Sequence, residues 1–403
     1  NSLLRGLGGG SNAIWSHKIR RVVRERLNGQ YENDFCRELN DRYYQTFDTH
    51  RQIATELYVT VIYRPTPSRI EGMFKRLLPR SIEAIKAKEA EDLDVIDDIA
   101  KHLSASLARY EPTRLGTFNR NGVAYSEMLT FLGYLVNGVW EDIPMRRSNI
   151  GEYLPTSRLH FGDKNGMLEI WHPTEHKFVG FLDIQDYPKY SEPGMNNGIL
   201  YGDYEYIETQ SFSIHNKHDA KHALERQKGQ LIASEESSPS ELADMDRAIN
   251  DLYDGHIEMG DYHYTLAIFG ETLDAVAKNI SVARSVLQDE ASFKMAVIDA
   301  IPECAWFAQL PGNWNMRPRE ASITSRNFAS LSPLHNFARG KRTGNPWGEA
   351  LALMKTPSGQ PYYLNFHTSP DDRDSTDEKY PGNTFICGAT GVGKTALEMA
   401  LLI

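Results

Sequence analysis

Eight consecutive residues near the end of the sequence have the types and spacing of a phosphate-binding loop. They run from Gly388 to Thr395 and match the pattern G-x-x-x-x-G-K-[ST]. The glycines let backbone amides converge on phosphate oxygens without a Cβ in the way. Lys394 would reach the β- and γ-phosphates, and the Thr395 hydroxyl would bind Mg²⁺. The pattern therefore favours a nucleotide site over an ordinary glycine-rich turn.

We expect ATP and Mg²⁺ at this loop, with Lys394 and Thr395 as the catalytic residues and Thr395 as the metal ligand. The residues predicted to contact the nucleotide are Gly388, Ala389, Thr390, Gly391, Val392, Gly393, Lys394, Thr395 and Ala396. Hydrolysis needs more: a metal-organising Asp on a later strand, a residue that positions water, and usually an arginine finger. Only eight residues follow Thr395. Because these residues cannot lie in so short a segment, we expect that this chain alone does not hydrolyse ATP.

The sequence around the loop predicts the elements that would position it. Thr384–Cys387 is short and apolar and is expected to be a strand entering the loop. Residues 396–401 are strong helix formers and are expected to continue as a helix, whose positive N-terminal end would add to the anion site. Cys387 is interpreted as a small apolar strand residue and not as a nucleophile, since no histidine stands beside it.

Length and composition limit the classes of protein that the chain can belong to. The 403 residues suggest two or three domains, and 40% hydrophobic residues exclude a disordered chain. The net charge of −10 argues against a constitutive nucleic-acid coat. The best apolar run, 128–140, is too short for a bilayer. Three scattered cysteines indicate a reducing compartment, so we expect a cytosolic protein.

Hydrophobic periodicity predicts a mixed α/β fold. The first part alternates strand 12–24, helix 32–47, strand 56–63, a helix beginning at Thr66-Pro67, and a long helix 82–110. Six acidic residues between Glu89 and Asp98 read as a solvated face of that helix. Residues 128–139 are expected to be a buried core helix, with a partner-docking helix as the alternative.

From residue 158 the sequence predicts a second α+β region with an antiparallel sheet. The expected strands are 158–161, 167–172, 178–183, 204–214, 262–269 and 293–297. The expected helices are 219–232, one beginning near Ser238-Pro239, and 273–288.

Several segments together resemble one known family. They are Phe35–Tyr43 (FCRELNDRY), Leu57–Pro65 (LYVTVIYRP), Phe307–Asn313 (FAQLPGN), Thr324–Phe337 (TSRNFASLSPLHNF), Gly344–Gly348 (GNPWG) and Pro361–His367 (PYYLNFH), followed by the phosphate-binding loop. In this order they resemble the CagE/TrbE/VirB family of type IV secretion and conjugal-transfer ATPases. The resemblance covers nearly the whole chain.

The resemblance implies an N-terminal α/β region followed by a RecA-like P-loop NTPase domain. We expect an N-terminal α/β subdomain at 1–150, a second α+β subdomain at 151–345, and the beginning of the ATPase domain at 346–403. The resemblance further implies homo-oligomers, as hexamers, on the cytoplasmic face of the bacterial inner membrane. It also implies other secretion-system subunits as partners, with DNA or protein in transit, and ATP hydrolysis that energises pilus assembly and substrate transfer.

Two other functions stay open at this point. One is a DNA-translocating motor of related RecA-like fold. The other is a non-catalytic docking module, formed by residues 1–345, for inner-membrane secretion components.

Weaker candidate sites are more simply explained by structure. His215, His218 and His222 have ligand-like spacing, but they and the pair His172 and His176 lack companion cysteines and are expected to be surface or capping histidines. The acidic residues between Asp371 and Glu378 lack metal-loop spacing and are expected to be a solvated loop.

Two basic clusters and three tryptophans complete the candidates. Lys18, Arg20, Arg21, Arg24 and Arg26 are interpreted as the solvated face of an edge strand or a subunit contact, with nucleic acid or acidic lipid as alternatives. A second cluster could contact nucleotide phosphate or a neighbouring subunit: Arg317, Arg319, Arg326, Arg339, Lys341 and Arg342. Trp306, Trp314 and Trp347 are expected to be packing residues.

Overall fold

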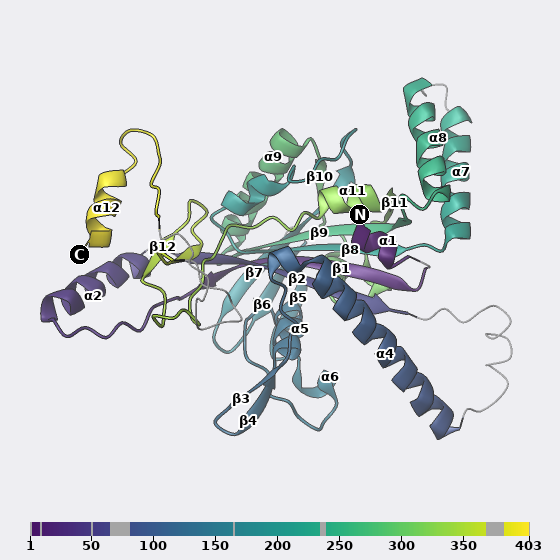
Figure 1. The fold of residues 1–403 in the computed structure, drawn as a ribbon. Coiled ribbons are helices and arrows are strands. Elements are labelled where there is room, and N and C mark those ends of the chain that lie inside the picture. Colours follow the sequence, from purple (N-terminus) through teal and green to yellow (C-terminus); the bar gives the residue numbers. More distant parts are fainter. Residues whose placement is uncertain are drawn as a thin grey trace. The chain divides into compact units, whose positions relative to one another are not determined.

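The computed structural model describes residues 2–8, 10–49, 51–64, 81–163, 166–233, 239–367 and 383–402. The chain forms two compact units (Figure 1). The first contains Asn1–Arg21 and Thr55–Asn336, and the second contains Val22–Ala54 and Phe337–Ile403. This grouping differs from the three ranges expected from the sequence, because strands from before and after residue 150 share one sheet.

A large antiparallel sheet forms the centre of the first unit. Its strand order is β2-β1-β8-β9-β7-β6-β5, with β10 beside β7 and β11 beside β9. The strands are β1 (Asn12–Val23), β2 (Gln52–Tyr63), β5 (Arg158–Asp163), β6 (Met167–Trp171), β7 (His176–Asp186), β8 (Tyr206–Ile214), β9 (Met259–Gly270), β10 (Lys294–Val297) and β11 (Ala321–Thr324). The strands predicted in the first unit are therefore present, and the pairs from β5 to β9 are antiparallel as expected.

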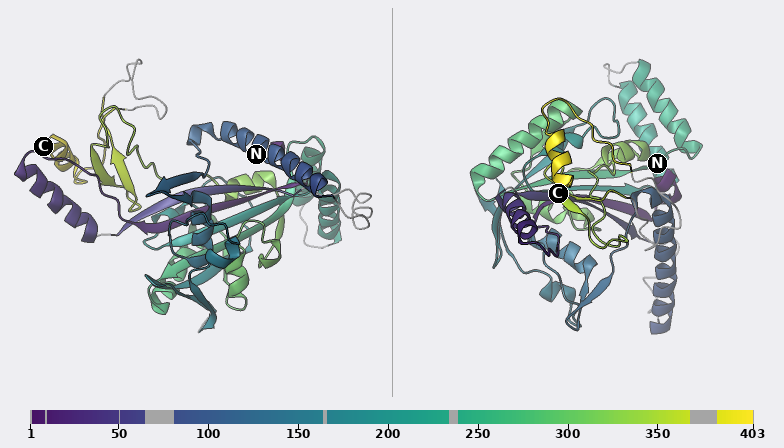
Figure 2. Two further views of the ribbon diagram at one scale, coloured as in Figure 1. Left: turned by 90° about the horizontal axis from the view of Figure 1, so that it is seen from below. Right: turned by 60° about the vertical axis from the view of Figure 1, so that its left-hand side comes forward.

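Helices cover both faces of this sheet (Figures 1 and 2). Alternate residues of β9 point to opposite faces, so Leu266 and Ile268 belong to one core cluster and Ala267 and Phe269 to the other. The first cluster is completed by α9 (Leu273–Ala291) and α11 (Ser325–Leu331), and the second by α5 (Glu127–Asn137) and α10 (Pro302–Phe307). Helix α5 is thus the buried core helix that the sequence predicted.

Glycine at position 180 allows α9 to approach β7 closely. A Cβ built on Gly180 would lie 2.4 Å from Cδ1 of Ile280 and 3.0 Å from Cγ1 of Val276. A side chain at 180 would require Ile280 and Val276 to shift, so the present packing of these two residues depends on the missing Cβ.

Helix α4 (Ile82–Ser106) of the first unit has no buried residue. It begins after Ser81, whose side chain accepts a hydrogen bond from the Ala84 amide. The acidic run on α4 is therefore solvated, as predicted. The other described elements of the first unit are α1 (Ser2–Gly6), η1 (Ala108–Tyr110), β3 (Thr117–Arg120), β4 (Val123–Ser126), α6 (Ile150–Tyr153), η2 (Asn197–Tyr201), α7 (Lys217–Ala233), α8 (Pro239–Tyr253) and η3 (Trp314–Met316). The helix predicted from Thr66-Pro67 lies outside the described residues.

The second unit has a small core of its own. Helix α2 (Asp34–Thr49) supplies Tyr44, and the hairpin of β12 (Ala352–Lys355) and β13 (Pro361–Leu364) supplies Leu353 and Tyr363. Helix α12 (Lys394–Leu402) follows the glycine-rich loop. None of the helices in the described ranges has the length and apolar character needed to cross a bilayer.

The interpretation of the first basic cluster as a solvated edge face was wrong for Lys18 and Arg20. Strand β1 lies between β2 and β8, so it is not an edge strand. Lys18 pairs with Glu208 on β8, its Nζ 3.1 Å from Oε2, and the two side chains are 4% and 2% exposed. Arg20 is buried and donates hydrogen bonds to the Thr55 hydroxyl and the Gly202 carbonyl. Their partners are distant in sequence, which is why local charge patterning misjudged them.

Two neutral histidines are buried on the opposite face of the sheet, His17 on β1 and His263 on β9. His17 Nε2 lies 2.8 Å from the Gln309 carbonyl oxygen, and His263 Nε2 lies 2.7 Å from Thr265 Oγ1. Burial lowers the pKa of His17 to about 4. Burial, with the nearby charge of Arg317, lowers the pKa of His263 to about 3. Both rings therefore remain neutral in the folded chain at ordinary pH.

The buried pair Lys18–Glu208 makes a first prediction. The substitution Glu208→Gln leaves a buried ammonium without its counter-charge and should lower the free energy of unfolding by about 3–5 kcal/mol. The double substitution Lys18→Met with Glu208→Leu removes both charges and should cost clearly less. Urea unfolding followed by circular dichroism measures both. A loss below about 1 kcal/mol for Glu208→Gln would contradict a desolvated pair.

The two histidines predict an acid-sensitive fold. The unfolded chain takes up protons at the ordinary pKa of 6.5, but the folded rings do so only near 4 and 3, so the free energy of unfolding should fall as pH drops from 6.5 towards 4. His263→Gln should make this fall shallower. Asp183→Asn is a control with the opposite pH dependence. Burial raises the pKa of this carboxyl from 3.8 to about 7, so this group lowers the stability of the wild type as pH rises between these two values. Identical pH profiles for wild type and His263→Gln would rule out this assignment.

Candidate nucleotide-binding site

Two residues of the glycine-rich loop have a left-handed backbone conformation. Gly391 and Gly393 have φ angles of 85° and 89°, in the left-handed region that favours glycine. No atom lies within 4 Å of a Cβ built on either residue, so conformation and not space requires glycine there. At Gly388 the reason is steric, because a Cβ would lie 2.9 Å from Cγ2 of Val392.

Helix α12 begins at Lys394 and leaves backbone donors at its first turn. The amide of Leu397 bonds to the Gly393 carbonyl. Within the described chain no hydrogen bond is made by the amides of Lys394, Thr395 and Ala396, which are the orphan donors of a helix N-terminus. These amides and the helix dipole favour an anion at this end of the helix.

The Lys394 side chain folds back over the loop. Its ammonium donates hydrogen bonds to the carbonyl oxygens of Gly388, at 2.7 Å, and Ala389, at 2.9 Å. A cation thus lies against the loop, and Thr395 is exposed beside it. The donor set of free amides, one ammonium and one hydroxyl fits a nucleotide phosphate with its Mg²⁺.

The strand predicted at Thr384–Cys387 is not formed. The residues lead into the loop without strand pairing, and the Phe385 side chain is 91% exposed. Among the described residues no strand lies beside this segment, and a strand needs a neighbour for its backbone hydrogen bonds. Cys387 is accordingly exposed and not a packed strand residue. The predicted helix is present as α12.

The candidate histidines contact neighbouring side chains. His215 Nε2 lies 2.9 Å from Asp261, which raises the pKa of the imidazole. The rings of His218 and His222 contact each other with centroids 4.4 Å apart, and His176 pairs with Glu169. The described residues contain no group of three metal-ligating side chains. The acidic residues between Asp371 and Glu378 lie outside the described part of the chain.

The second basic cluster is paired within each unit. In the first unit Arg317 pairs with Glu320 at 2.7 Å and Arg326 with Asp251 at 3.3 Å. In the second unit Arg339 and Arg342 both pair with Glu25, at 2.9 and 2.7 Å. The structure therefore gives these arginines acidic partners, and contact with phosphate or a neighbouring subunit stays a prediction.

The three tryptophans differ in their surroundings. Trp306 is fully buried, as predicted for a packing residue. Trp314 contacts Trp15 edge-on, with centroids 4.6 Å apart. Trp347 is 38% exposed and donates a hydrogen bond from Nε1 to Asn365.

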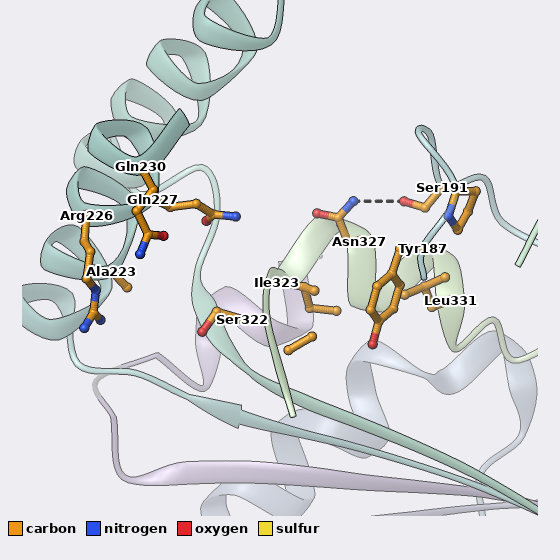
Figure 3. A pocket seen from close by; sticks show the side chains of 12 residues that line it. Tyr187, Ser191, Ala223, Arg226, Gln227, Gln230, Ser322, Ile323, Asn327 and Leu331 are labelled. Carbon is orange, nitrogen blue, oxygen red and sulfur yellow. Dashed lines mark hydrogen bonds between the residues drawn. The ribbon is translucent and has the colours of Figure 1, made fainter. Parts of the chain in front are cut away.

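One pocket in the first unit was not predicted from the sequence (Figure 3). It encloses about 490 Å³ between α7 on one side and α11 with the segment around Tyr187 on the other. Its walls include Arg226, Gln227 and Gln230 from α7 and Asn327 from α11, with Ala321–Ile323 of β11 between them. Three separate stretches of sequence form it, residues 187–191, 223–230 and 321–331, so no local motif could have shown it.

Comparison with known proteins adds two matches to family models. The CagE, TrbE, VirB family, component of type IV transporter system, matches residues 113–319. The N-terminal domain of the type IV secretion system ATPase VirB4/TrbE matches residues 1–70.

Three curated relatives are similar along nearly the whole chain. The type IV secretion system protein virB4 of Brucella melitensis biotype 1 is 42% identical over 404 residues, covering 98% of this chain and 48% of the relative. PtlC of Bordetella pertussis is 36% identical over 409 residues, covering 100% and 49%. The virB4 protein of Bartonella henselae is 33% identical over 404 residues, covering 100% and 50%. The chain thus spans about half the length of the curated relatives it matches.

Proposed function

We propose a function from an established premise: this chain belongs to the VirB4/TrbE family of type IV secretion system ATPases. In our proposal the loop Gly388–Ala396 binds ATP with Mg²⁺. The observation that carries the proposal is the loop itself, with left-handed glycines at 391 and 393 and an ammonium held over its carbonyls.

In this proposal each residue type has a separate task. The amides at the start of α12 bind phosphate oxygens, because they are free donors at the positive end of a helix. Lys394 exchanges the carbonyls of Gly388 and Ala389 for the β- and γ-phosphates, and its charge stabilises theirs. Thr395 supplies a hydroxyl to Mg²⁺, and the bound ion neutralises developing phosphate charge.

For the whole protein we propose that ATP hydrolysis energises pilus assembly and substrate transfer. The family assignment and the relatives named as type IV secretion proteins support this role. We further propose a homo-oligomer, a hexamer, on the cytoplasmic face of the bacterial inner membrane, with other secretion-system subunits as partners and DNA or protein in transit.

A second candidate is a docking role for the first unit. This unit has its own two-sided core and does not contain the nucleotide loop. The two roles are separable, since docking would survive loss of nucleotide binding. A DNA-translocating motor is the third possibility, and salt-sensitive stimulation of the full-length ATPase by DNA would distinguish it.

The lysine provides the direct test. Lys394→Ala removes the only ammonium seen on the loop in the described structure and should weaken binding of a fluorescent ATP analogue at least about tenfold, without changing the unfolding midpoint. Lys355→Ala, an exposed lysine of β12 in the same unit, should leave affinity unchanged. In the full-length protein the same lysine substitution should abolish ATP turnover. Parental affinity in Lys394→Ala would refute the site.

Gly393 of the loop gives a second test, and Gly229 of α7 gives a comparison at a glycine with ordinary helical conformation. Gly393→Ala places a Cβ on a residue with φ of 89° and should weaken nucleotide binding by distorting the loop, although no atom obstructs the Cβ. Gly229→Ala in α7 adds a methyl to a helix with open space around it and should raise the free energy of unfolding by about 0.5–1 kcal/mol. Calorimetric titration with ATP measures the first effect and urea unfolding the second. Undiminished ATP affinity in Gly393→Ala would show that the loop conformation is not used.

A further inference from the structure

The pocket between α7 and α11 presents polar side chains that make no hydrogen bond or ion pair with other described residues. Arg226, Gln227 and Gln230 stand on one side of α7 and line the pocket (Figure 3). No side-chain hydrogen bond or ion pair joins these three residues to any other described residue. One guanidinium and two primary amides are therefore available to a ligand, and each amide offers a donor and an acceptor.

The opposite side of the pocket is ordered and partly apolar. Asn327 donates a hydrogen bond to Ser191 at 3.0 Å, which ties α11 to the segment after β7. Leu331 is 3% exposed, and Ile323 and the Tyr187 ring add apolar surface. No Asp or Glu occurs among the lining residues, so the charge of Arg226 has no counter-charge within the pocket. This combination suits an acidic ligand with an apolar part.

A strand edge borders the same pocket. Strand β11 pairs with β9, and among the described strands it has no partner on its other side. The Ser325 amide bonds to the Glu258 carbonyl in the same register, so residues 321 and 323 also face β9. The backbone N–H and C=O of Ser322 consequently point away from β9. A peptide in extended conformation can bind such a free edge.

We propose that this pocket binds an extended acidic peptide segment, which pairs with the free edge of β11 while Arg226 binds a carboxylate. The amides of Gln227 and Gln230 bind its peptide groups, and an apolar side chain packs between Tyr187 and Leu331. The proposal is independent of the nucleotide loop, because all the residues that carry it belong to the first unit.

The test uses the whole chain and fluorescence polarisation of a labelled eight-residue peptide with alternating Asp and Leu. We expect the acidic peptide to bind and a Lys–Leu counterpart to bind at least about tenfold more weakly. Arg226→Gln should weaken binding about tenfold. Arg147→Gln, at an exposed arginine of the same unit outside the pocket, is the matched control and should not change it.

Two further comparisons examine the strand edge. Ser322→Pro removes the outward N–H and leaves the β9 ladder intact, so it should abolish binding, whereas Ser322→Ala keeps the N–H and should retain it. Two further peptides are N-methylated, one on its Asp amides and the other on its Leu amides. The amides of alternate residues point to the same edge of a strand, so the peptide whose methylated amides face β11 should lose binding.

Three results would overturn the proposal: equal affinity for the Lys–Leu peptide, unchanged affinity in Arg226→Gln, or unchanged affinity in a folded Ser322→Pro variant. Binding of a labelled oligothymidylate that is lost in Arg226→Gln, with no binding of the acidic peptide, would indicate a phosphate site instead and would also overturn it. The Lys394→Ala variant should bind the peptide normally, so failure here and failure of the nucleotide site are distinguishable.

Discussion

The ion pair between Lys18 and Glu208 favours one register of β1 against β8 in the central sheet. The two residues are directly opposite each other on β1 and β8, and both are almost completely shielded from water. Because side chains alternate between faces, a slip of one residue would move the lysine to the other face and leave two buried charges without partners. Asn196 adds a hydrogen bond to the other carboxylate oxygen, so the carboxylate is held from two directions.

Sequence reasoning succeeded where the information was local. Strand alternation and helix periodicity predicted β8, β9 and α9, and the capping and proline signals placed the start of α8 near Pro239. The helix after the glycine-rich loop was predictable as well, because the residues that form it are consecutive. In each case neighbouring residues determine the backbone conformation, and the rest of the fold needs only to be compatible with it.

Sequence reasoning failed where the burial or pairing of a residue depends on residues distant in the chain. Lys18 and Arg20 look like a solvated charged face until β8 and the Gly202 carbonyl are brought beside them by the topology. The segment at Phe385 has strand composition, but a strand requires a neighbour that composition cannot supply. The pocket beside α7 depends on three segments whose proximity only the fold creates.

The close contact between Gly180 and Ile280 has an evolutionary consequence. The space that a side chain at 180 would take is already filled by the isoleucine of α9, so we expect the combined volume at these two positions to be limited across the family. Relatives with alanine at 180 are expected to carry a smaller residue at 280, and the two positions should covary across the family. Such covariation would be a record, in sequences alone, of how closely one helix approaches one strand.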